Sequence, residues 1–288
     1  MTSATATIFR DVAAAAEFDR NGFVVVPFLD ADQVECLRDV YFRHHAESDV
    51  RARTIPSYAP GFYASTFNND MDYRRAVSAE VTAACAAALA RLFDAFKIFY
   101  AGFLVKLPDA NGRLRVHQDP TLVDEARFTP VNVWCPLQNI DDRNGALCVL
   151  PGSQRLYRGP RATSIPPPWA AHESLIESRM TPLHLAAGSA VLFTQATLHA
   201  SRPNLSDTPR ITATMFLCHE TASIRIAHRR PETPERIDFY AQDDDFMFQN
   251  VQFSVNSTGV PQIGRYLDSM PYDAAPVAAD AIVRLAAL

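Results

Sequence analysis

Apolar residues recur at helical spacing in two stretches of the first third of the chain. The first predicted helix begins after Asp30, which has capping-box spacing with Gln33. A short strand, Gly22–Phe28, is expected before it, and a second helix is expected from about Ser78 to Phe96. The apolar positions that define the helices are Val34, Leu37, Val40 and Tyr41 in the first and Val81, Cys85, Leu89, Leu92 and Phe96 in the second.

From about Lys97 onward the pattern changes to short β-branched and aromatic runs. Turn signals such as Asn144-Gly145 and Pro151-Gly152 separate these runs. Many short strands with no helix between them favour an antiparallel barrel or jelly roll over an α/β sheet. The predicted fold is mainly β with flanking helices, around a double-stranded β-helix (jelly roll, cupin-like) core. Its strands are expected at Ile98–Lys106, Val131–Leu137, Ala146–Leu150, Ala190–Phe193 and Arg210–Leu217.

No internal repeat or low-complexity linker divides the sequence, so one domain is expected over residues 1–288. Its parts are a helical N-terminal part (1–96), the jelly-roll core (97–222) and a C-terminal extension (223–288). Within the core, residues 155–181 contain a Pro-Pro-Pro-Trp run without strand pattern, which is typical of a lid over a site. The extension could fold over the same mouth, and its Asp243-Asp244-Asp245 run is expected to be a solvated loop.

The net charge of −5 and the absence of a Lys/Arg cluster argue against a nucleic-acid partner. No apolar run is long enough to span a bilayer, and the N-terminus lacks the basic region of a signal peptide. The cysteines form no Cys-x-x-Cys pair and lie in predicted helices or strands, which favours buried reduced thiols. We therefore expect a cytoplasmic protein without membrane partners, while the sequence gives no indication of the oligomeric state. The cysteines are Cys36, Cys85, Cys135, Cys148 and Cys218.

Two histidines and one acidic residue stand out as candidate metal ligands. His117, Asp119 and His199 supply two imidazoles and one carboxylate, the ligand set of non-haem Fe(II) oxygenases. His117 and Asp119 follow a strand-like stretch, Arg113–Val116, and are two residues apart, so they can face the same side. His199 is expected to end another strand-like run, Thr194–Leu198. The alternative is one core and one surface histidine, because a lone His-x-acid pattern is weak evidence.

A second His-x-acid pattern shows this risk. His45-Ala46-Glu47 has the same spacing but ends the first predicted helix. We interpret it as a solvated C-terminal turn rather than as a ligand pair.

Four sequence motifs provide evidence about function beyond the single candidate ligands. Phe18–Pro27 reads Phe-Asp-Arg-Asn-Gly-Phe-Val-Val-Val-Pro, and Val116–Asp119 reads Val-His-Gln-Asp. Val-Trp-Cys-Pro-Leu at 133–137 leads to Asn-Gly-Ala-Leu at 144–147 and Leu-Pro-Gly-Ser at 150–153. His-Ala-Ser-Arg-Pro-Asn at 199–204 precedes Arg210. In this order the motifs resemble the phytanoyl-CoA dioxygenase family of Fe(II)- and 2-oxoglutarate-dependent oxygenases over most of the chain. Gln154 departs from the histidine that the family often has there.

The resemblance implies that His117, Asp119 and His199 ligate the iron. It also implies that Arg210 pairs with the distal carboxylate of 2-oxoglutarate and that Ser201 adds a hydroxyl hydrogen bond. The physical case for Arg210 stands beside it: a guanidinium matches a carboxylate in two hydrogen bonds. Arg210 also begins a mostly apolar strand, where a charge needs a partner. The alternative for Arg210 is a surface salt bridge.

Two further residues have candidate roles toward the co-substrate. Lys106 matches a position where the family often has a basic residue, and it either helps to neutralise 2-oxoglutarate or extends to water. Trp134 and Asn132 share one side of their strand because they are two residues apart. If that side is the barrel interior, they approach the cofactor or the substrate; otherwise Trp134 is a core residue.

The substrate is expected to be a small organic molecule with apolar area. Aromatic residues in the loop between the two helices and residues of the predicted lid are the candidates for contacting it, and Arg161 suggests an anionic group. A natural-product intermediate or an amino-acid-like molecule is favoured over a fatty acyl-CoA, because no basic cluster suits the phosphates of coenzyme A. The candidate substrate residues are Tyr58, Phe62, Tyr63, Phe67, Asn132, Arg161 and Trp169.

The function implied is oxidation, by default hydroxylation, of an unactivated C–H bond with Fe(II), 2-oxoglutarate and O₂. Succinate and CO₂ would be released. Desaturation, cyclisation and epimerisation by the same iron-based oxidant stay open, whereas Asp119 fills the position that related halogenases leave free for chloride. The competing hypothesis is a non-catalytic metal-binding jelly-roll protein that acts in binding or sensing and would not need Arg210 or Ser201.

Overall fold

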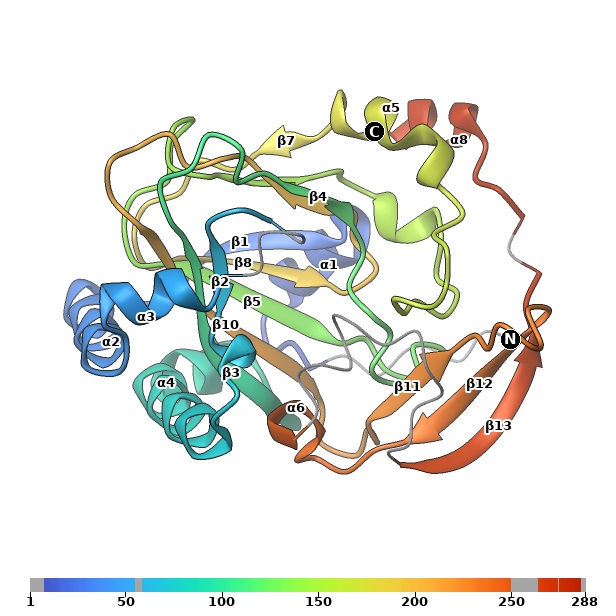
Figure 1. Ribbon diagram of the computed structural model, residues 1–288, viewed down its shortest axis with the longest axis horizontal. Coiled ribbons are helices and arrows are strands. Elements are labelled where there is room, and N and C mark those ends of the chain that lie inside the picture. Colours follow the sequence, from blue (N-terminus) through green and yellow to red (C-terminus); the bar gives the residue numbers. More distant parts are fainter. Residues whose placement is uncertain (1–7, 55–58, 250–263, 274, 286–288) are drawn as a thin grey trace.

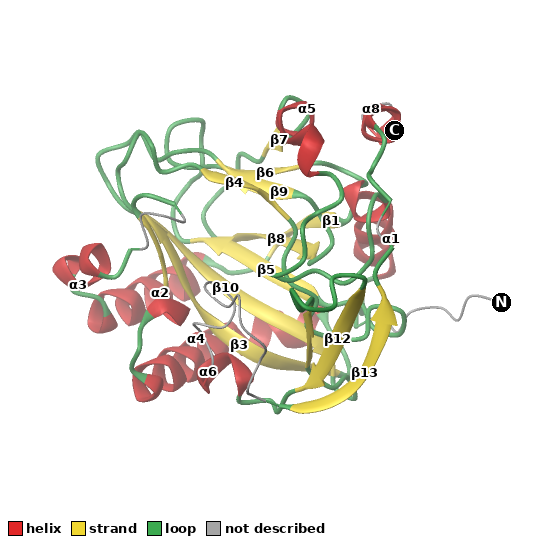
Figure 2. Cartoon of the chain, turned by 45° about the vertical axis from the view of Figure 1, so that its right-hand side comes forward, coloured by secondary structure: helices red, strands yellow, loops and turns green. Residues whose placement is uncertain are grey.

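Two antiparallel sheets face each other in this computed structural model, which describes residues 8–54, 59–249, 264–273 and 275–285 (Figures 1 and 2). The larger has six strands in the order β1 (Phe23–Pro27), β8 (Ser189–Thr194), β5 (Val131–Pro136), β10 (Arg210–His219), β3 (Phe96–Lys106) and β2 (Phe62–Ala64). The smaller has β4 (Leu114–His117), β9 (His199–Ser201), β6 (Leu147–Val149) and β7 (Thr181–Pro182). This arrangement confirms the predicted jelly-roll core.

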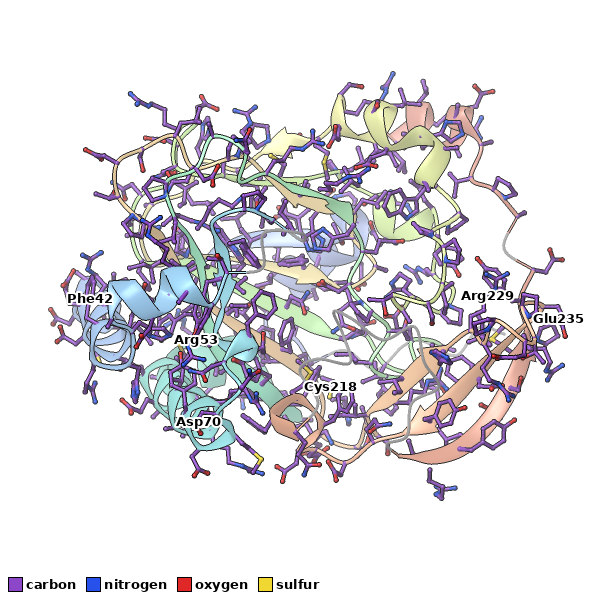
Figure 3. The ribbon with its side chains drawn as sticks, viewed as in Figure 1. Phe42, Arg53, Asp70, Cys218, Arg229 and Glu235 are labelled. Atoms are coloured by element: carbon purple, nitrogen blue, oxygen red, sulfur yellow. The ribbon has the colours of Figure 1, made fainter. Side chains whose placement is uncertain are left out.

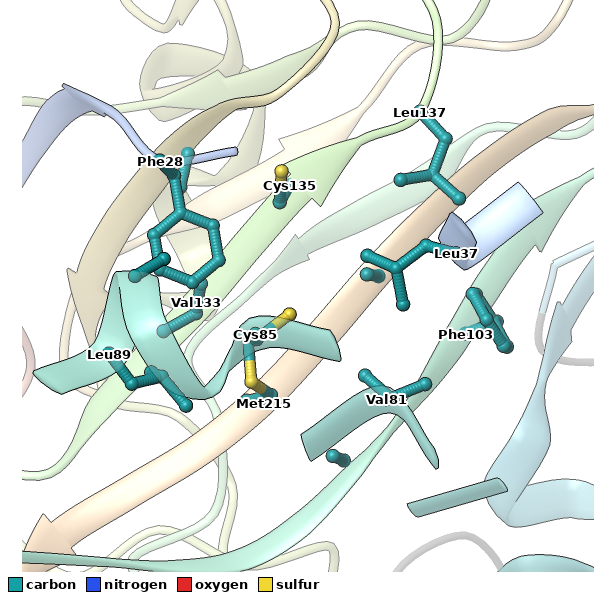
Figure 4. Close-up of a cluster of buried hydrophobic side chains, with 14 of the residues drawn as sticks. Phe28, Leu37, Val81, Cys85, Leu89, Phe103, Val133, Cys135, Leu137 and Met215 are labelled. Carbon is teal, nitrogen blue, oxygen red and sulfur yellow. The ribbon is translucent and has the colours of Figure 1, made fainter. Parts of the chain in front are cut away.

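Helices cover the outer face of the six-stranded sheet (Figure 1). The main ones are α1 (Val12–Asn21), α2 (Ala31–His44) and α4 (Met71–Leu92), and α3 (Glu47–Ala52) follows α2. Their apolar faces pack on the strands in the largest hydrophobic cluster, where Leu37, Leu89 and Met215 lie together (Figure 4). Because both faces of this sheet are covered, its central strands β5 and β10 are buried nearly throughout.

Strand alternation separates the two faces of the large sheet. On β5, Val133 and Cys135 face the helices, while Asn132 and Trp134 face the opposite sheet. On β10 the residues from Ile211 to Leu217 alternate in the same way. The side chains that can carry chemistry therefore lie on the inner side, between the two sheets.

The first predicted helix is confirmed, and Asp30 and Gln33 form the expected capping box. The second begins and ends earlier than predicted, at Met71 and Leu92. It begins there because Asp70 caps its first turn, and it ends because Ala95 adopts a positive φ of 47° that turns the chain into β3.

The strand predicted at Thr194–Leu198 is wrong. Thr197 donates its backbone N–H to the Thr194 carbonyl, which forms a turn between the two sheets. His199 therefore begins β9 instead of ending a strand. The chain needs this turn because it passes from β8 in one sheet to β9 in the other.

The predicted lid contains short helical turns and α5 (Glu173–Glu177), which contacts α8 (Ala279–Leu285) near the C-terminus. The extension also forms a small third sheet of β11 (Arg225–His228), β12 (Arg236–Ala241) and β13 (Arg265–Pro271), and it contains α6 (Phe246–Gln249). Its acidic run is a largely exposed turn, as predicted, and two of its carboxylates also form surface ion pairs. Asp244 pairs with Lys97 at 2.7 Å and Asp245 pairs with Arg75 at 2.7 Å, which ties the run to β3 and α4.

Four of the cysteines are buried free thiols, as expected, and Cys218 lies inside the fold (Figure 3). Cys36 is exposed, so the prediction that every cysteine is buried is wrong for this position. Cys36 falls on the outer side of α2, whose apolar stripe is formed by other residues. None of the helices within the described residues has the length and apolarity that a bilayer crossing requires.

Candidate functional site

A cavity of about 240 Å³ lies between the two sheets. One wall comes from the inner faces of β5, β10 and β3, and the other comes from β4, β9 and the loops that follow them. Most of its surface is apolar, although polar and charged side chains also contribute to it. The aromatic residues in the wall are Phe62, Phe67, Trp134, Phe193, Phe216 and Phe246.

The three candidate metal ligands converge on this wall. His117 ends β4 and His199 begins β9, and the two residues are partners in the β4–β9 ladder. Their ring centroids are 4.0 Å apart, and Oδ1 of Asp119 lies 3.9 Å from Nε2 of each ring. One ligand atom from each of the three residues lies within 4.8 Å of the others.

Backbone carbonyls fix the orientation of both imidazoles. Nδ1 of His117 donates to the Arg115 carbonyl at 2.8 Å, and Nδ1 of His199 donates to the Thr197 carbonyl at 2.9 Å. A carbonyl only accepts, so each Nδ1 carries the proton and each Nε2 offers a lone pair toward Asp119. Burial, and secondarily the nearby His199, lowers the pKa of His117 to about 4, which keeps the ring neutral. This donor set fits a divalent metal ion.

Three neighbours hold Asp119 in place. The side-chain amide of Asn132 donates to Oδ2, which leaves Oδ1 facing the histidines. The backbone N–H of Asp119 donates to the Gln195 carbonyl at 3.0 Å. Nε of Arg161 donates to the Asp119 carbonyl at 2.9 Å. Asn132 therefore acts on the carboxylate while Gln195 and Arg161 fix its backbone.

Arg210 is a buried guanidinium in the cavity wall with no acidic partner among the described residues. Its exposed fraction is 2%, and it lies over the Trp134 ring at 5.1 Å. Nη1 donates to the Thr212 hydroxyl at 3.0 Å, and Nε has no hydrogen-bond partner. Burial lowers its pKa to about 9, which leaves it cationic at neutral pH. The surface salt-bridge alternative is wrong, and the side chain is suited to an anionic ligand.

Lys106 lies behind this wall. It is fully buried, so the alternative in which it extends to water is wrong. Nζ donates to the Ser201 hydroxyl at 2.7 Å and to the Arg202 carbonyl at 2.6 Å, which positions Ser201 in the cavity wall. Gly145 makes room for it, because a Cβ there would lie 2.7 Å from Cδ of Lys106.

The structure separates the predicted aromatic substrate residues. Phe62 and Phe67 line the cavity, and their rings meet edge to face at 6.1 Å. Tyr63 was expected beside them but points to the helix side, because neighbours on a strand face opposite ways, and its hydroxyl contacts that of Tyr73 at 3.0 Å. Tyr58 lies outside the described residues.

Two other expectations need correction. Trp169 does not line the cavity; it packs in an apolar cluster under α5 and α8, and its indole N–H donates to Gln118 at 2.9 Å. Arg161 lines the cavity, but Glu125 neutralises it through two hydrogen bonds, so it offers no free charge to an anionic substrate. Neither partner is close in sequence, which explains the error.

His45, interpreted as solvated, is also buried. Its exposed fraction is 5%, and it stacks on Tyr41 and accepts from or donates to the Tyr73 hydroxyl. It lies on the helix side of the sheet, in contact with residues of the main core and away from the cavity wall.

Several residues that line the cavity were not predicted from the sequence, because no motif marks their positions. Thr214 and Phe216 continue the inward face that begins at Arg210, so strand alternation could have found them. Gln195 lies in the turn before His199, where no periodic pattern exists. Other wall residues that were missed include Phe193, Ile226, Ala227, Phe246 and Met247.

A family model described as phytanoyl-CoA dioxygenase (PhyH) matches residues 18–212, more than half of the chain. The chain belongs to the phytanoyl-CoA dioxygenase family. This membership confirms the resemblance seen in the sequence motifs and makes the chain a 2-oxoglutarate-dependent non-haem iron oxygenase. No curated protein matches the sequence.

Solved structures share the fold. The epimerase SnoN in complex with Fe³⁺, alpha ketoglutarate and nogalamycin RO is 21% identical, with 89% of this chain and 94% of that chain covered and a TM-score of 0.52. The carbocyclase SnoK from nogalamycin biosynthesis is 19% identical, with coverages of 74% and 86% and a TM-score of 0.53. HygX from Streptomyces hygroscopicus, with nickel, 2-oxoglutarate and hygromycin B bound, is 18% identical, with coverages of 73% and 88% and a TM-score of 0.52.

Replacing Asn132 tests its hold on Asp119. We expect Asn132→Ala to weaken Ni(II) affinity by about 10- to 100-fold, because the carboxylate loses the hydrogen bond that orients it. Isothermal titration calorimetry measures the affinity, and circular dichroism checks the fold. Asn111→Ala at an exposed position is the matched control. Unchanged affinity in Asn132→Ala would show that the backbone contacts alone position Asp119.

Lys106 predicts a pH-dependent stability of the metal-free protein. Burial, with a smaller effect of Arg210, lowers its pKa from 10.5 to about 6. Between these values the unfolded chain binds a proton that the folded chain does not, so the free energy of unfolding rises with pH. The Lys106 contribution between pH 7 and 9 is up to about 1.4 kcal/mol per pH unit. Urea titrations should show a smaller rise in Lys106→Met and an unaltered one in Lys97→Met; equal slopes in all three proteins would contradict the assignment.

Proposed function

We propose that this chain uses Fe(II), 2-oxoglutarate and O₂ to oxidise an unactivated C–H bond of a small organic molecule, with release of succinate and CO₂. The observation that carries the proposal is the convergence of two histidines and one aspartate beside a buried guanidinium that has no acidic partner in the described part of the chain. A metal with open positions and a cation for a diacid are what this reaction needs in one cavity.

His117, Asp119 and His199 would hold the iron, with their free donor atoms directed to one point. Arg210 would pair with the distal carboxylate of 2-oxoglutarate, and Ser201 would add its hydroxyl from the same wall. Trp134 lies against the guanidinium and shields it from water. When bound, iron with 2-oxoglutarate and O₂ supplies the oxidising chemistry, and the chain orients the reactants and excludes solvent.

Lys106 would act indirectly. It positions the Ser201 hydroxyl but does not line the cavity, and burial lowers its pKa to about 6, so it adds little positive charge behind the wall at neutral pH. Asn132 was predicted from the sequence to contact the substrate, but its side-chain amide donates a hydrogen bond to Asp119. Phe62 and Phe67 are the aromatic residues of the original set that can meet a substrate.

Hydroxylation is the outcome proposed first. Proteins of similar fold include an epimerase and a carbocyclase. Epimerisation, cyclisation and desaturation are therefore the alternative reactions for this cavity. A binding or sensing protein without catalysis would have no use for an unpaired buried cation, because such a group destabilises the fold unless a ligand neutralises it. Arg210 therefore favours the enzyme.

We propose that the enzyme is cytoplasmic and consists of a single domain. Free thiols and the net charge of −5 support a cytoplasmic protein that acts on a small molecule and has no nucleic-acid partner. A single domain over residues 1–288 is supported by the cavity wall. Phe62 from the N-terminal part, Arg210 from the core and Phe246 from the extension all contribute to it.

The metal centre is tested by removing one imidazole. We expect His199→Ala to lower Ni(II) and Fe(II) affinity by at least about 100-fold, because two ligands hold a divalent ion far less tightly than three. His184→Ala, at an exposed histidine that pairs with Asp142, should bind metal normally. Calorimetry gives the affinities. A folded His199→Ala protein with undiminished affinity would rule out this metal site.

Arg210→Ala tests capture of the co-substrate. Loss of the guanidinium proposed to pair with the distal carboxylate should weaken 2-oxoglutarate binding to the Ni(II)-loaded protein by about 100-fold, as expected for truncation of a buried charge pair. Succinate formation with Fe(II) and ascorbate should fall correspondingly. Arg202→Ala, which removes a half-exposed guanidinium paired with Asp142, is the matched control. Equal 2-oxoglutarate affinity in the two variants would favour the binding-protein alternative.

A further inference from the structure

Every charged side chain that lines the described cavity wall already has a partner or a proposed ligand. Among the described residues these side chains are His117, Asp119, His199, Arg210 and Arg161. The first three form the metal site, and Arg210 faces the co-substrate. Arg161 is neutralised by Glu125, whose two carboxylate oxygens each accept from its guanidinium.

The internal segments outside the described residues, 55–58, 250–263 and the single residue Ala274, cannot change this balance. Residues 55–58 read Ile-Pro-Ser-Tyr, and residues 250–263 read Asn-Val-Gln-Phe-Ser-Val-Asn-Ser-Thr-Gly-Val-Pro-Gln-Ile. None of the segments contains Asp, Glu, Lys, Arg or His. Wherever these residues lie, their side chains bring no formal charge to the cavity.

The loaded site is also neutral as a whole, provided that the proposed function holds. Two positive charges of Fe(II) and one of Arg210 balance the carboxylate of Asp119 and the two carboxylates of 2-oxoglutarate. The imidazoles stay uncharged because their Nε2 lone pairs face the metal. No net charge is left to attract an ionic substrate.

We infer that the substrate is an uncharged, largely apolar molecule. An ion transferred from water into this cavity would lose its hydration and find no counter-charge, which is strongly unfavourable. The apolar wall of Phe62, Phe67, Leu104 and Phe216 instead gains free energy by covering an apolar surface. This inference rests on the proposed function and disfavours amino-acid-like, carboxylate and acyl-CoA substrates.

Gln195 points to the polar group that the substrate carries. Its side chain lines the cavity beside the metal site, its exposed fraction is 1%, and its Oε1 has no hydrogen-bond partner. A buried amide without a partner is costly, and a ligand hydroxyl or amide can satisfy it. A neutral hydroxyl- or amide-bearing substrate would therefore fit both the apolar wall and this group.

Three probes that share one ring system test the inference. Naphthalene-2-carboxamide is neutral, naphthalene-2-carboxylate is an anion, and 2-(aminomethyl)naphthalene is a cation at neutral pH. Ni(II) and 2-oxoglutarate are titrated into the protein first, and each probe is then titrated by calorimetry. We expect the neutral probe to bind at least about tenfold more tightly than either ion. Failure of the first titrations counts against the proposed function, whereas the order of probe affinities tests the substrate class alone.

A variant that leaves Arg161 without its carboxylate partner provides a second test. Glu125→Gln removes the partner of Arg161, so the carboxylate probe should gain about tenfold in affinity while the ammonium probe does not. Glu177→Gln, which removes the partner of Arg113 outside the cavity wall, should leave the probe order unchanged. The inference is overturned if an ionic probe binds the loaded wild-type protein as tightly as the amide. It is equally overturned if the amide does not bind, or if Glu125→Gln leaves carboxylate affinity unaltered.

Discussion

The pairing of β4 with β9 is the constraint on which the rest of the site depends. It places His117 opposite His199, although the two residues come from distant parts of the sequence. Each ring is then fixed by a carbonyl two residues earlier in its own chain segment. Asp119 completes the set because its backbone is bonded to Gln195, in the turn that leads into β9. The same turn therefore positions both His199 and the carboxylate of Asp119.

The buried basic side chains near the cavity differ in whether a carboxylate neutralises them. Arg161 has a carboxylate partner, so it stabilises the loop that carries Asp119. Arg210 has none among the described residues and stays cationic at neutral pH. Unpaired buried cations destabilise a folded chain, typically by several kcal/mol. Lys106 avoids this cost, because burial lowers its pKa to about 6 and its amine donates to neutral oxygen acceptors. A bound diacid would neutralise this region, so ligand binding and folding stability are coupled at the base of the cavity.

Local patterns in the sequence were sufficient for much of the fold. The capping box at Asp30 and the strand at Arg210–Leu217 depend on neighbours within a few residues, and both are found in the structure. Features that depend on distant partners could not be predicted in this way. Whether Phe62 or Tyr63 faces the cavity depends on the register with β3, and the neutralisation of Arg161 depends on Glu125, 36 residues away. The two candidate ligand histidines could be predicted because the motifs around them resemble a known family; their spacing in the sequence alone does not show that they converge.

The family match also separates chemistry from substrate selection. Residues 18–212 include His117, Asp119, His199 and Arg210, the groups proposed for iron and 2-oxoglutarate. The cavity wall continues beyond that range. Phe216, Ile226, Ala227, Phe246 and Met247 lie on β10, on β11 and in α6, and all of them are uncharged. The charged residues proposed for iron and 2-oxoglutarate therefore lie within the matched range, while the apolar wall extends beyond it. Under the proposed function, substrate selectivity rests on shape and apolar contact, and changes in the C-terminal extension would alter the substrate without removing the proposed metal ligands.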